Sequence, residues 1–255
     1  MSFMKNWWKY LCILLLFYTV IMGFKGSIPE LNILEESIRN LYFHVPMWFA
    51  MMTLMLVSVV YSIRYLSKQK IEDDIKAAAF AKVGFLFGFL GILTGAVWAR
   101  ATWGAWWVFQ EVKLNGAAAA LLVYAAYFIL RGSFDDEEKK ARFSAVYSIF
   151  AFVMFMVLIN VIPRISNSSL HPGNGGNPGF NSYDLDSNLR LVFYPAVLGW
   201  ILLSVWIATL LIRVEKIFRK KHGLDLEESL ISPVINSSKN NKVENTDYID
   251  FEEIK

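Results

Sequence analysis

Six long apolar segments constrain this chain more than any other feature of its sequence. They cover residues 7–24, 45–63, 83–98, 114–130, 143–162 and 191–212. A helix needs about 20 residues to cross about 30 Å of hydrocarbon, so these segments can span a membrane, the third and fourth with the help of their flanks. The two-residue alternation typical of a membrane β-barrel is absent from the sequence. The pattern predicts an all-α, polytopic membrane protein with six transmembrane helices.

The composition agrees with a membrane domain. Of the 255 residues, 56% are hydrophobic and 18% are charged, whereas a soluble domain is about 45–50% apolar and about 25% charged. The single cysteine, Cys12, excludes a disulfide framework within one chain. The net charge of +3 gives no sign of a nucleic-acid partner. The first segment lacks a clear small-x-small cleavage site, so we expect a retained helix and not a removed signal peptide.

The basic residues are sorted along the chain. Nineteen of the 25 Lys and Arg residues fall at the N-terminus, in two alternate loops and in the C-terminal part. Loops rich in Lys and Arg stay in the cytoplasm, so both termini should be cytoplasmic, and loops 25–44, 99–113 and 163–190 should face outward. Residues 223–255 are polar and lack periodicity, which is typical of disorder. We therefore expect a membrane domain over residues 1–222, followed by a disordered cytoplasmic tail.

Two of the three histidines lie in the predicted outer loops. His44 stands in LYFHVPMW, directly before the second span, and His171 stands in SSLHPGNGGNPGF, whereas His222 follows a basic run on the inner side. A lone loop histidine is more often solvated than a ligand, but these two share one side, and a neighbouring proline restricts each backbone. Two imidazoles without a carboxylate or thiol cluster suit an axial pair on a haem iron better than a zinc site with about four protein ligands.

The strongest local signal is WARATWGAWWVFQEVKLNG, residues 98–116, in which four of the nine tryptophans are concentrated. If this stretch is helical, Trp103, Trp106 and Trp107 lie within about 100° of one another and form a broad indole surface. An interfacial anchor would also explain tryptophans at this place. Their concentration in one segment favours a surface for a large flat ligand with polar edges, such as haem.

Other residues of the outer loops suggest supporting roles. Arg100 and Lys113 could pair with haem propionates. The glycine-rich run 173–179 lacks the spacing of a phosphate-binding loop and indicates successive turns. It suits a mobile loop that places His171 over a ligand or withdraws it, although plain loop filler explains the glycines equally well. Asp186 comes just before the last span, where an acid commonly caps a helix.

Together these motifs resemble the haem exporter protein C family of bacterial cytochrome c maturation. The resemblance covers roughly residues 41–206 and rests on WGAWWVFQEVKLNG, FHVP and LHPGNGG; the Trp-rich part is shared with a wider superfamily that includes c-type cytochrome synthases. It implies that His44 and His171 are axial ligands of a transiently held haem b. The implied platform consists of Trp103, Trp106 and Trp107. No C-x-x-C-H motif occurs, so we expect this haem to be non-covalent.

The resemblance also implies a location and partners. The chain would lie in the bacterial inner membrane with its haem site facing the periplasm. It would pass haem to a membrane-anchored haem chaperone, with ATP-binding cassette transporter subunits assisting release. The family places an acid and then a base after the tryptophans, and Glu111 and Lys113 keep that spacing but arrive one residue late. Either Glu111 takes the acid's role through a local bulge, or Gln110 does so without charge.

Two other functions compete with this one. A cytochrome c synthase would present haem to an apocytochrome as an enzyme, but such synthases resemble larger proteins with further histidines inside the membrane, and the predicted spans hold none. A small-molecule permease should show ionisable residues or broken helices at mid-membrane, and these spans show almost none. We therefore favour a haem-handling protein that is not an enzyme.

Overall fold

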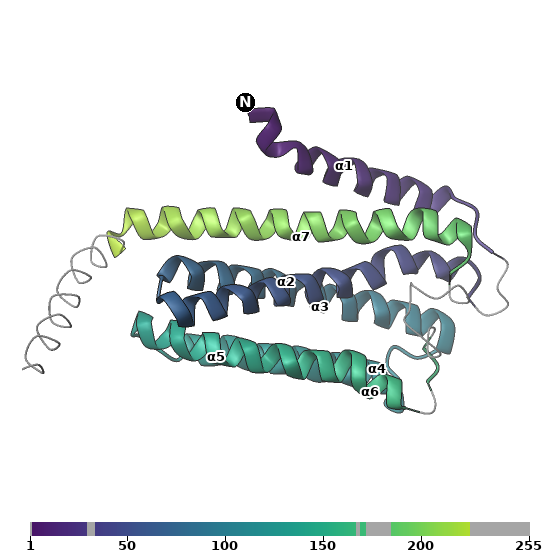
Figure 1. The fold of residues 1–255 in the computed structure, drawn as a ribbon. Coiled ribbons are helices and arrows are strands. Elements are labelled where there is room, and N and C mark those ends of the chain that lie inside the picture. Colours follow the sequence, from purple (N-terminus) through teal and green to yellow (C-terminus); the bar gives the residue numbers. More distant parts are fainter. Residues whose placement is uncertain (1, 30–33, 167–168, 172–184, 225–255) are drawn as a thin grey trace, which may run out of the picture. The chain divides into compact units, whose positions relative to one another are not determined.

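The computed structural model describes residues 2–29, 34–166, 169–171 and 185–224, so most of the predicted tail lies outside the described residues. The chain divides into two units, Met1–Leu210 and Leu211–Lys255. The elements follow in chain order (Figure 1): α1 (Ser2–Lys25), the 3-10 helix η1 (Glu35–Asn40), α2 (Leu41–Lys68), α3 (Ile71–Trp103), α4 (Val112–Gly132), α5 (Glu137–Met156), the π-helix η2 (Val157–Val161), α6 (Ile162–Ile165) and α7 (Ser187–Lys221).

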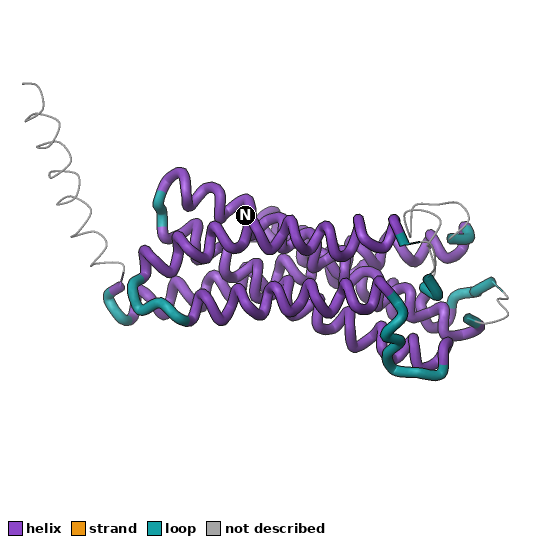
Figure 2. Tube along the Cα trace, turned by 90° about the horizontal axis from the view of Figure 1, so that it is seen from below, coloured by secondary structure: helices purple, strands orange, loops and turns teal. Residues whose placement is uncertain are grey.

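Six helical stretches are long and apolar enough to cross a membrane, which confirms the predicted fold class. Within the first unit, α2 packs against α3 and α5, and α4 packs against α5. The last residues of α1, α3 and α6 and the first residues of α2, α4 and α7 lie at one end of this unit (Figures 1 and 2). The described part of the second unit is the end of α7, which carries basic residues in its last turn. The described parts of the three predicted outer loops are thus gathered at one end.

A stripe of glycines on α3 lets this helix approach α2 closely. Each glycine faces a larger side chain of α2, and the pairs are Gly84 with Met55, Gly88 with Met51, Gly91 with Trp48, and Gly95 with His44. A Cβ atom added at Gly88 would lie 2.3 Å from Met51 Sδ, and one added at Gly95 would lie 2.7 Å from His44 Cε1. Small residues at a membrane-helix interface permit such close packing. The glycine stripe therefore fixes the register of α2 against α3.

Two prolines lie inside helices, and side chains of neighbouring helices compensate for them. Pro46 in α2 cannot donate to the Tyr42 carbonyl four residues earlier, and Trp200 Nε1 of α7 donates to that carbonyl at 3.2 Å. Pro195 of α7 repeats the arrangement, since the carbonyl four residues before it accepts a hydrogen bond from the Tyr18 hydroxyl at 3.3 Å. Unpaired carbonyls are costly in hydrocarbon, so these bonds fasten α7 to α2 and α1 to α7.

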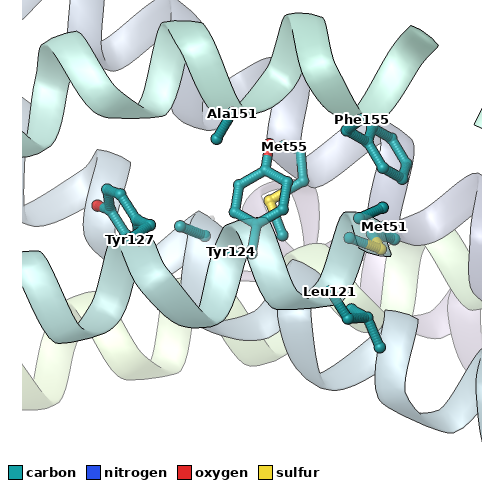
Figure 3. Close-up of a cluster of buried hydrophobic side chains, with 9 residues drawn as sticks. Met51, Met55, Leu121, Tyr124, Tyr127, Ala151 and Phe155 are labelled. Atoms are coloured by element: carbon teal, nitrogen blue, oxygen red, sulfur yellow. The ribbon is translucent and has the colours of Figure 1, made fainter. Parts of the chain in front are cut away.

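Large side chains fill the space between α2, α4 and α5 (Figure 3). The labelled members of this core are Met51, Met55, Leu121, Tyr124, Tyr127, Ala151 and Phe155. A second cluster lies between η1, α2, α3 and α7, where the side chains of Tyr42, Trp98 and Phe193 are almost fully buried. This second cluster supports the end of the unit at which the predicted outer loops are gathered.

A buried ion pair links α3 to α4 near the opposite end of these helices. Arg131 donates from both terminal nitrogens to the two carboxylate oxygens of Asp74, at 2.7 and 2.6 Å. Both side chains are largely buried, and bidentate geometry is the strong form of such a pair. Removing one partner of a buried pair leaves an uncompensated charge, so the pair holds α3 and α4 together where the sequence predicts the inner side.

Candidate functional site

His44 lies inside α2 and is buried, with 7% of its surface exposed. The prediction that it precedes the second span is therefore wrong, because the helix begins at Leu41 and η1 leads into it. Pro46 does not end the helix, since the carbonyl that it leaves unpaired accepts a hydrogen bond from Trp200. The first imidazole is consequently part of a packed helix and not of a loop.

Hydrogen bonds fix the orientation of the His44 ring. Its Nδ1 atom lies 3.0 Å from the Gly91 carbonyl oxygen and 3.2 Å from Thr94 Oγ1. A carbonyl oxygen only accepts, so the Gly91 contact places the proton on Nδ1 and leaves the lone pair on Nε2. A metal-ligating histidine commonly donates its other ring N–H to a backbone carbonyl in this way. The ring edges also contact Trp48 and Trp98, with centroids at 6.5 and 5.9 Å.

His171 approaches His44 from the segment between α6 and α7. The two imidazole centroids lie 6.2 Å apart, with the ring planes inclined by 46°. The Trp103 ring stands edge to face against His171, at a centroid distance of 6.4 Å and an angle of 65°. The structure therefore brings together the two outer histidines and the first tryptophan of the predicted platform.

The spacing of the two imidazoles suits one shared metal ion. A metal–imidazole bond of about 2.0–2.1 Å, with the ring centre about 1.2 Å behind the nitrogen, separates two axial ring centres by about 6.4 Å. Among the described residues, no group of three or more His, Cys, Asp and Glu side chains could hold a metal ion. Two protein ligands leave the remaining positions to the bound molecule, as on the iron of a haem.

The Trp-rich segment is not one continuous helix. Trp103 is the last residue of α3, and Gly104 follows with a φ of 76°, a left-handed conformation that ends helices. The expectation that Trp103, Trp106 and Trp107 share one helical face is therefore wrong. Trp106 is 60% exposed in the loop, whereas Trp107 is half-buried and donates from Nε1 to Asn115 Oδ1 of α4 at 3.3 Å.

Glu111 is the buried acid of this loop, and its neighbour Gln110 is exposed. The Glu111 N–H donates to the Val108 carbonyl at 3.0 Å and closes a turn directly before α4. The Glu111 carboxylate caps α4 by accepting from the Lys113 N–H at 3.3 Å. The same carboxylate also accepts from the Ser169 hydroxyl at 2.6 Å and from the Leu170 N–H at 2.8 Å.

The protein holds Glu111 in its ionised form. Burial raises the pKa of this carboxyl group, but the hydrogen bonds from Ser169, Leu170 and Lys113, together with the nearby His171, outweigh that effect. The pKa therefore lies below its usual range. Hydrogen bonds to the charged form are the cause of the lowered value.

The remaining predicted side chains lie at the margin of the site. Arg100, in the last turn of α3, donates to the Gly104 carbonyl. Lys113 is half-buried in the first turn of α4. Asp186 Oδ2 accepts from the Asn188 N–H at 3.2 Å, which confirms the predicted cap of α7. The glycine-rich run 173–179 lies outside the described residues.

Sequence reasoning missed the residues that hold the two histidines. Gly91, Thr94 and Gly95 shape the space around His44, and Ser169 connects Glu111 to the backbone of His171. The glycines of α3 recur at intervals of four, three and four residues, which is a signal for a close helix contact. Nothing in the sequence indicates which residue lies opposite Ser169.

Comparison with known proteins gives one consistent result. A family profile described as "Heme exporter protein C" matches residues 1–226, a range that includes both histidines. The chain is 27% identical over 200 residues to Heme exporter protein C of Escherichia coli (strain K12), with 76% of each chain covered. It is 25% identical over 187 residues to the protein of that name from Paracoccus denitrificans, which covers 72% of this chain and 75% of the relative. A third, from Bradyrhizobium diazoefficiens, is 30% identical over 114 residues, or 44% of this chain and 43% of the relative.

Proposed function

Because the chain belongs to the haem exporter protein C family of bacterial cytochrome c maturation, we propose that it holds haem between His44 and His171 and then hands it on. The family consists of multi-pass membrane proteins that handle haem and are not known enzymes. The observation that carries the proposal is the convergence of the two imidazoles, from α2 and from the segment before α7, at a centroid distance of 6.2 Å.

Each imidazole contributes differently to the haem iron. His44 presents Nε2 because its Nδ1 is engaged with α3, so this ligand needs little rearrangement when haem arrives. His171 would supply the second nitrogen ligand from the segment between α6 and α7. With two axial nitrogens, the iron has no open coordination site for chemistry, which suits a protein that carries haem and does not transform it.

The tryptophans would provide contact area for the haem macrocycle. Trp103 lies against His171, and Trp106 exposes most of its indole in the adjoining loop. Aromatic faces supply apolar contact area to a flat ligand, and a few polar groups then fix its orientation. Arg100 and Lys113, at the two ends of this loop, are the bases that would pair with the haem propionates. The bound haem b would be held without a covalent bond.

The site faces the periplasm in this proposal. The sorting of 19 of the 25 basic residues supports this orientation, because it places both termini in the cytoplasm. A membrane-anchored haem chaperone would then receive the haem from the outer surface. ATP-binding cassette transporter subunits would assist its release.

A synthase role receives less support. The argument from the sequence that no histidine lies within a span no longer holds, because His44 is part of α2. The family match now favours the handling role, since it covers residues 1–226 and names an exporter. The other relatives reported above carry the same name.

An absorption spectrum of the detergent-purified protein, oxidised and then reduced, tests the proposal. We expect a haem Soret band, and a spectrum typical of low-spin haem iron with two nitrogen ligands. The double variant His44→Ala/His171→Ala should lose or shift this band, and His222→Ala should leave it unchanged because His222 lies at the end of α7. Protein without haem, purified from cells that make haem freely, would overturn the proposal.

A further inference from the structure

The Glu111 carboxylate reaches the segment that carries His171. Its two oxygens accept hydrogen bonds from two consecutive residues, Oε1 from the Ser169 hydroxyl at 2.6 Å and Oε2 from the Leu170 N–H at 2.8 Å. These residues are 58 and 59 positions away in the chain. We refer to this set of contacts as the Glu111 clamp. It connects the start of α4 to the segment before α7.

The clamp extends to His171 itself. Ser169 Oγ, which donates to Glu111, accepts from the His171 N–H at 3.1 Å. One hydroxyl can donate one hydrogen bond and accept another, so Ser169 transmits the position of the carboxylate to the backbone of His171. The imidazole of His171 lies near the rings of both Trp103 and His44.

The carboxylate is committed to this task. Only 2% of the Glu111 surface is exposed, and both oxygens are engaged with Ser169, Leu170 and the N–H of Lys113. Hydrogen bonds to an ionised acceptor are shorter and about twice as strong as neutral ones. A group so enclosed is poorly placed to contact a propionate or a partner protein.

We propose that Glu111 is a positioning residue, which holds His171 opposite His44 and thereby sets the second axial bond to haem without touching the haem. This inference rests on the proposed function. In this inference Glu111 orients a haem ligand and does not itself bind haem. The inference also explains why Glu111 is buried while its neighbour Gln110 is exposed.

A measurement on the haem-free protein tests the clamp directly. Glu111→Asn keeps a residue that is favoured as a helix N-cap but is one methylene shorter, whereas Glu111→Gln keeps the length and loses one acceptor oxygen. We expect hydrogen exchange of the Leu170 amide to become about 10-fold faster or more in Glu111→Asn, as for a lost bond to a charged group. Glu111→Gln should have a smaller effect, and the exposed neighbour variant Gln110→Ala should have none.

The spectrum of the haem-loaded protein tests the consequence. Loss of a group that orients a ligand typically weakens metal binding by about 10- to 100-fold, and we expect that increase in the haem dissociation constant of Glu111→Asn. Its spectrum should resemble that of His171→Ala, with a smaller fraction of low-spin haem and with haem still bound. Adding Glu111→Asn to His171→Ala should change nothing further, because the clamp then has no ligand to position.

Ser169→Ala provides a second route that leaves the cap of α4 intact. It should weaken the low-spin form as well, since it removes the link to the His171 N–H. Unchanged spectra in Glu111→Asn and Ser169→Ala, beside a low-spin haem spectrum in the parent protein, would overturn the inference alone. A parent protein without haem would overturn the proposed function instead, while the exchange measurement would still test the clamp.

Discussion

His44 and His171 meet in space but are held by different kinds of structure. His44 belongs to a 28-residue helix, and a neighbouring helix fixes its ring through the Gly91 carbonyl and the space left at Gly95. His171 belongs to the segment between α6 and α7, in which Ser169 and Leu170 donate hydrogen bonds to the Glu111 carboxylate at the start of α4. The first proposed ligand is therefore fixed by helix packing, and the second is linked to α4 through the hydrogen bonds of Glu111 and Ser169. In the proposed function, this difference would favour loss of the His171 bond to haem before the His44 bond.

The largest change in haem affinity should come from removing each imidazole in turn, which compares the two histidines directly. We expect His44→Ala to raise the haem dissociation constant by more than about 100-fold, since it deletes the ligand whose orientation is already set. His171→Ala should retain more haem, bound through one imidazole. Haem titration of the two purified variants measures the difference. Equal losses, or a greater loss in His171→Ala, would contradict the asymmetry.

Filling the space beside His44 should have the next largest effect. In Gly95→Ala the new methyl group would lie 2.7 Å from His44 Cε1 and must displace the ring. We expect about a 10-fold increase in the haem dissociation constant, the lower end of the range for a disturbed ligand orientation. Gly132→Ala is the matched control, because no atom lies within 4 Å of its added methyl group. The same haem affinity in both variants would show that the ring does not depend on this space.

Removing an exposed indole should act on haem without changing its ligands. Trp106→Ala should weaken haem binding by about 0.5–1.5 kcal/mol, the contribution of one aromatic contact, and leave the low-spin spectrum intact. Phe109→Ala, in the same loop and 79% exposed, serves as the control. A change of spin state in Trp106→Ala would indicate that the loop positions His171 and does not simply offer a surface.

The smallest change in haem affinity should come from a substitution that destabilises the helix around His44. Trp200→Phe removes the N–H that donates to the Tyr42 carbonyl, so we expect it to lower the free energy of unfolding by about 1–3 kcal/mol. Pro46→Ala restores a backbone donor to that carbonyl. The double variant should therefore lose less stability than the sum of the two single changes, as measured by thermal unfolding in detergent. Additive losses would show that the two groups are not coupled.

The fold was predictable because the signals that determine it are local in the sequence. Apolar runs of spanning length and sorted Lys and Arg residues are local signals, and they lead to six helices without any knowledge of tertiary contacts. The placement of His44 was not predictable in the same way. A proline two residues later indicates a helix boundary, and the indole that satisfies the carbonyl left free lies in α7, at residue 200.

For the candidate site, the sequence indicated which residues to examine but not how most of them are arranged. Both histidines and Trp103 come together as expected, because their residue types already mark them. The expectation that the tryptophans share one helical face is wrong, since Gly104 takes a left-handed conformation and ends α3. The partnership of Glu111 with Ser169 depends on two segments 58 residues apart, and no spacing in the sequence reports such a contact.

The glycine stripe of α3 also has a consequence for the order in which the protein is made. Its four glycines accept four side chains of α2 at the same spacing, so a slip by one turn would bring mismatched shapes together. The contacts that set the register of α2 against α3 all lie between residues 44 and 95, so both partners of each contact are made before α4 and α7. His44 belongs to the hairpin of α2 and α3, whereas Glu111, Ser169 and His171 all follow it in the chain. The part of the candidate site that α2 and α3 carry is therefore made before the part that α4 and the segment before α7 carry.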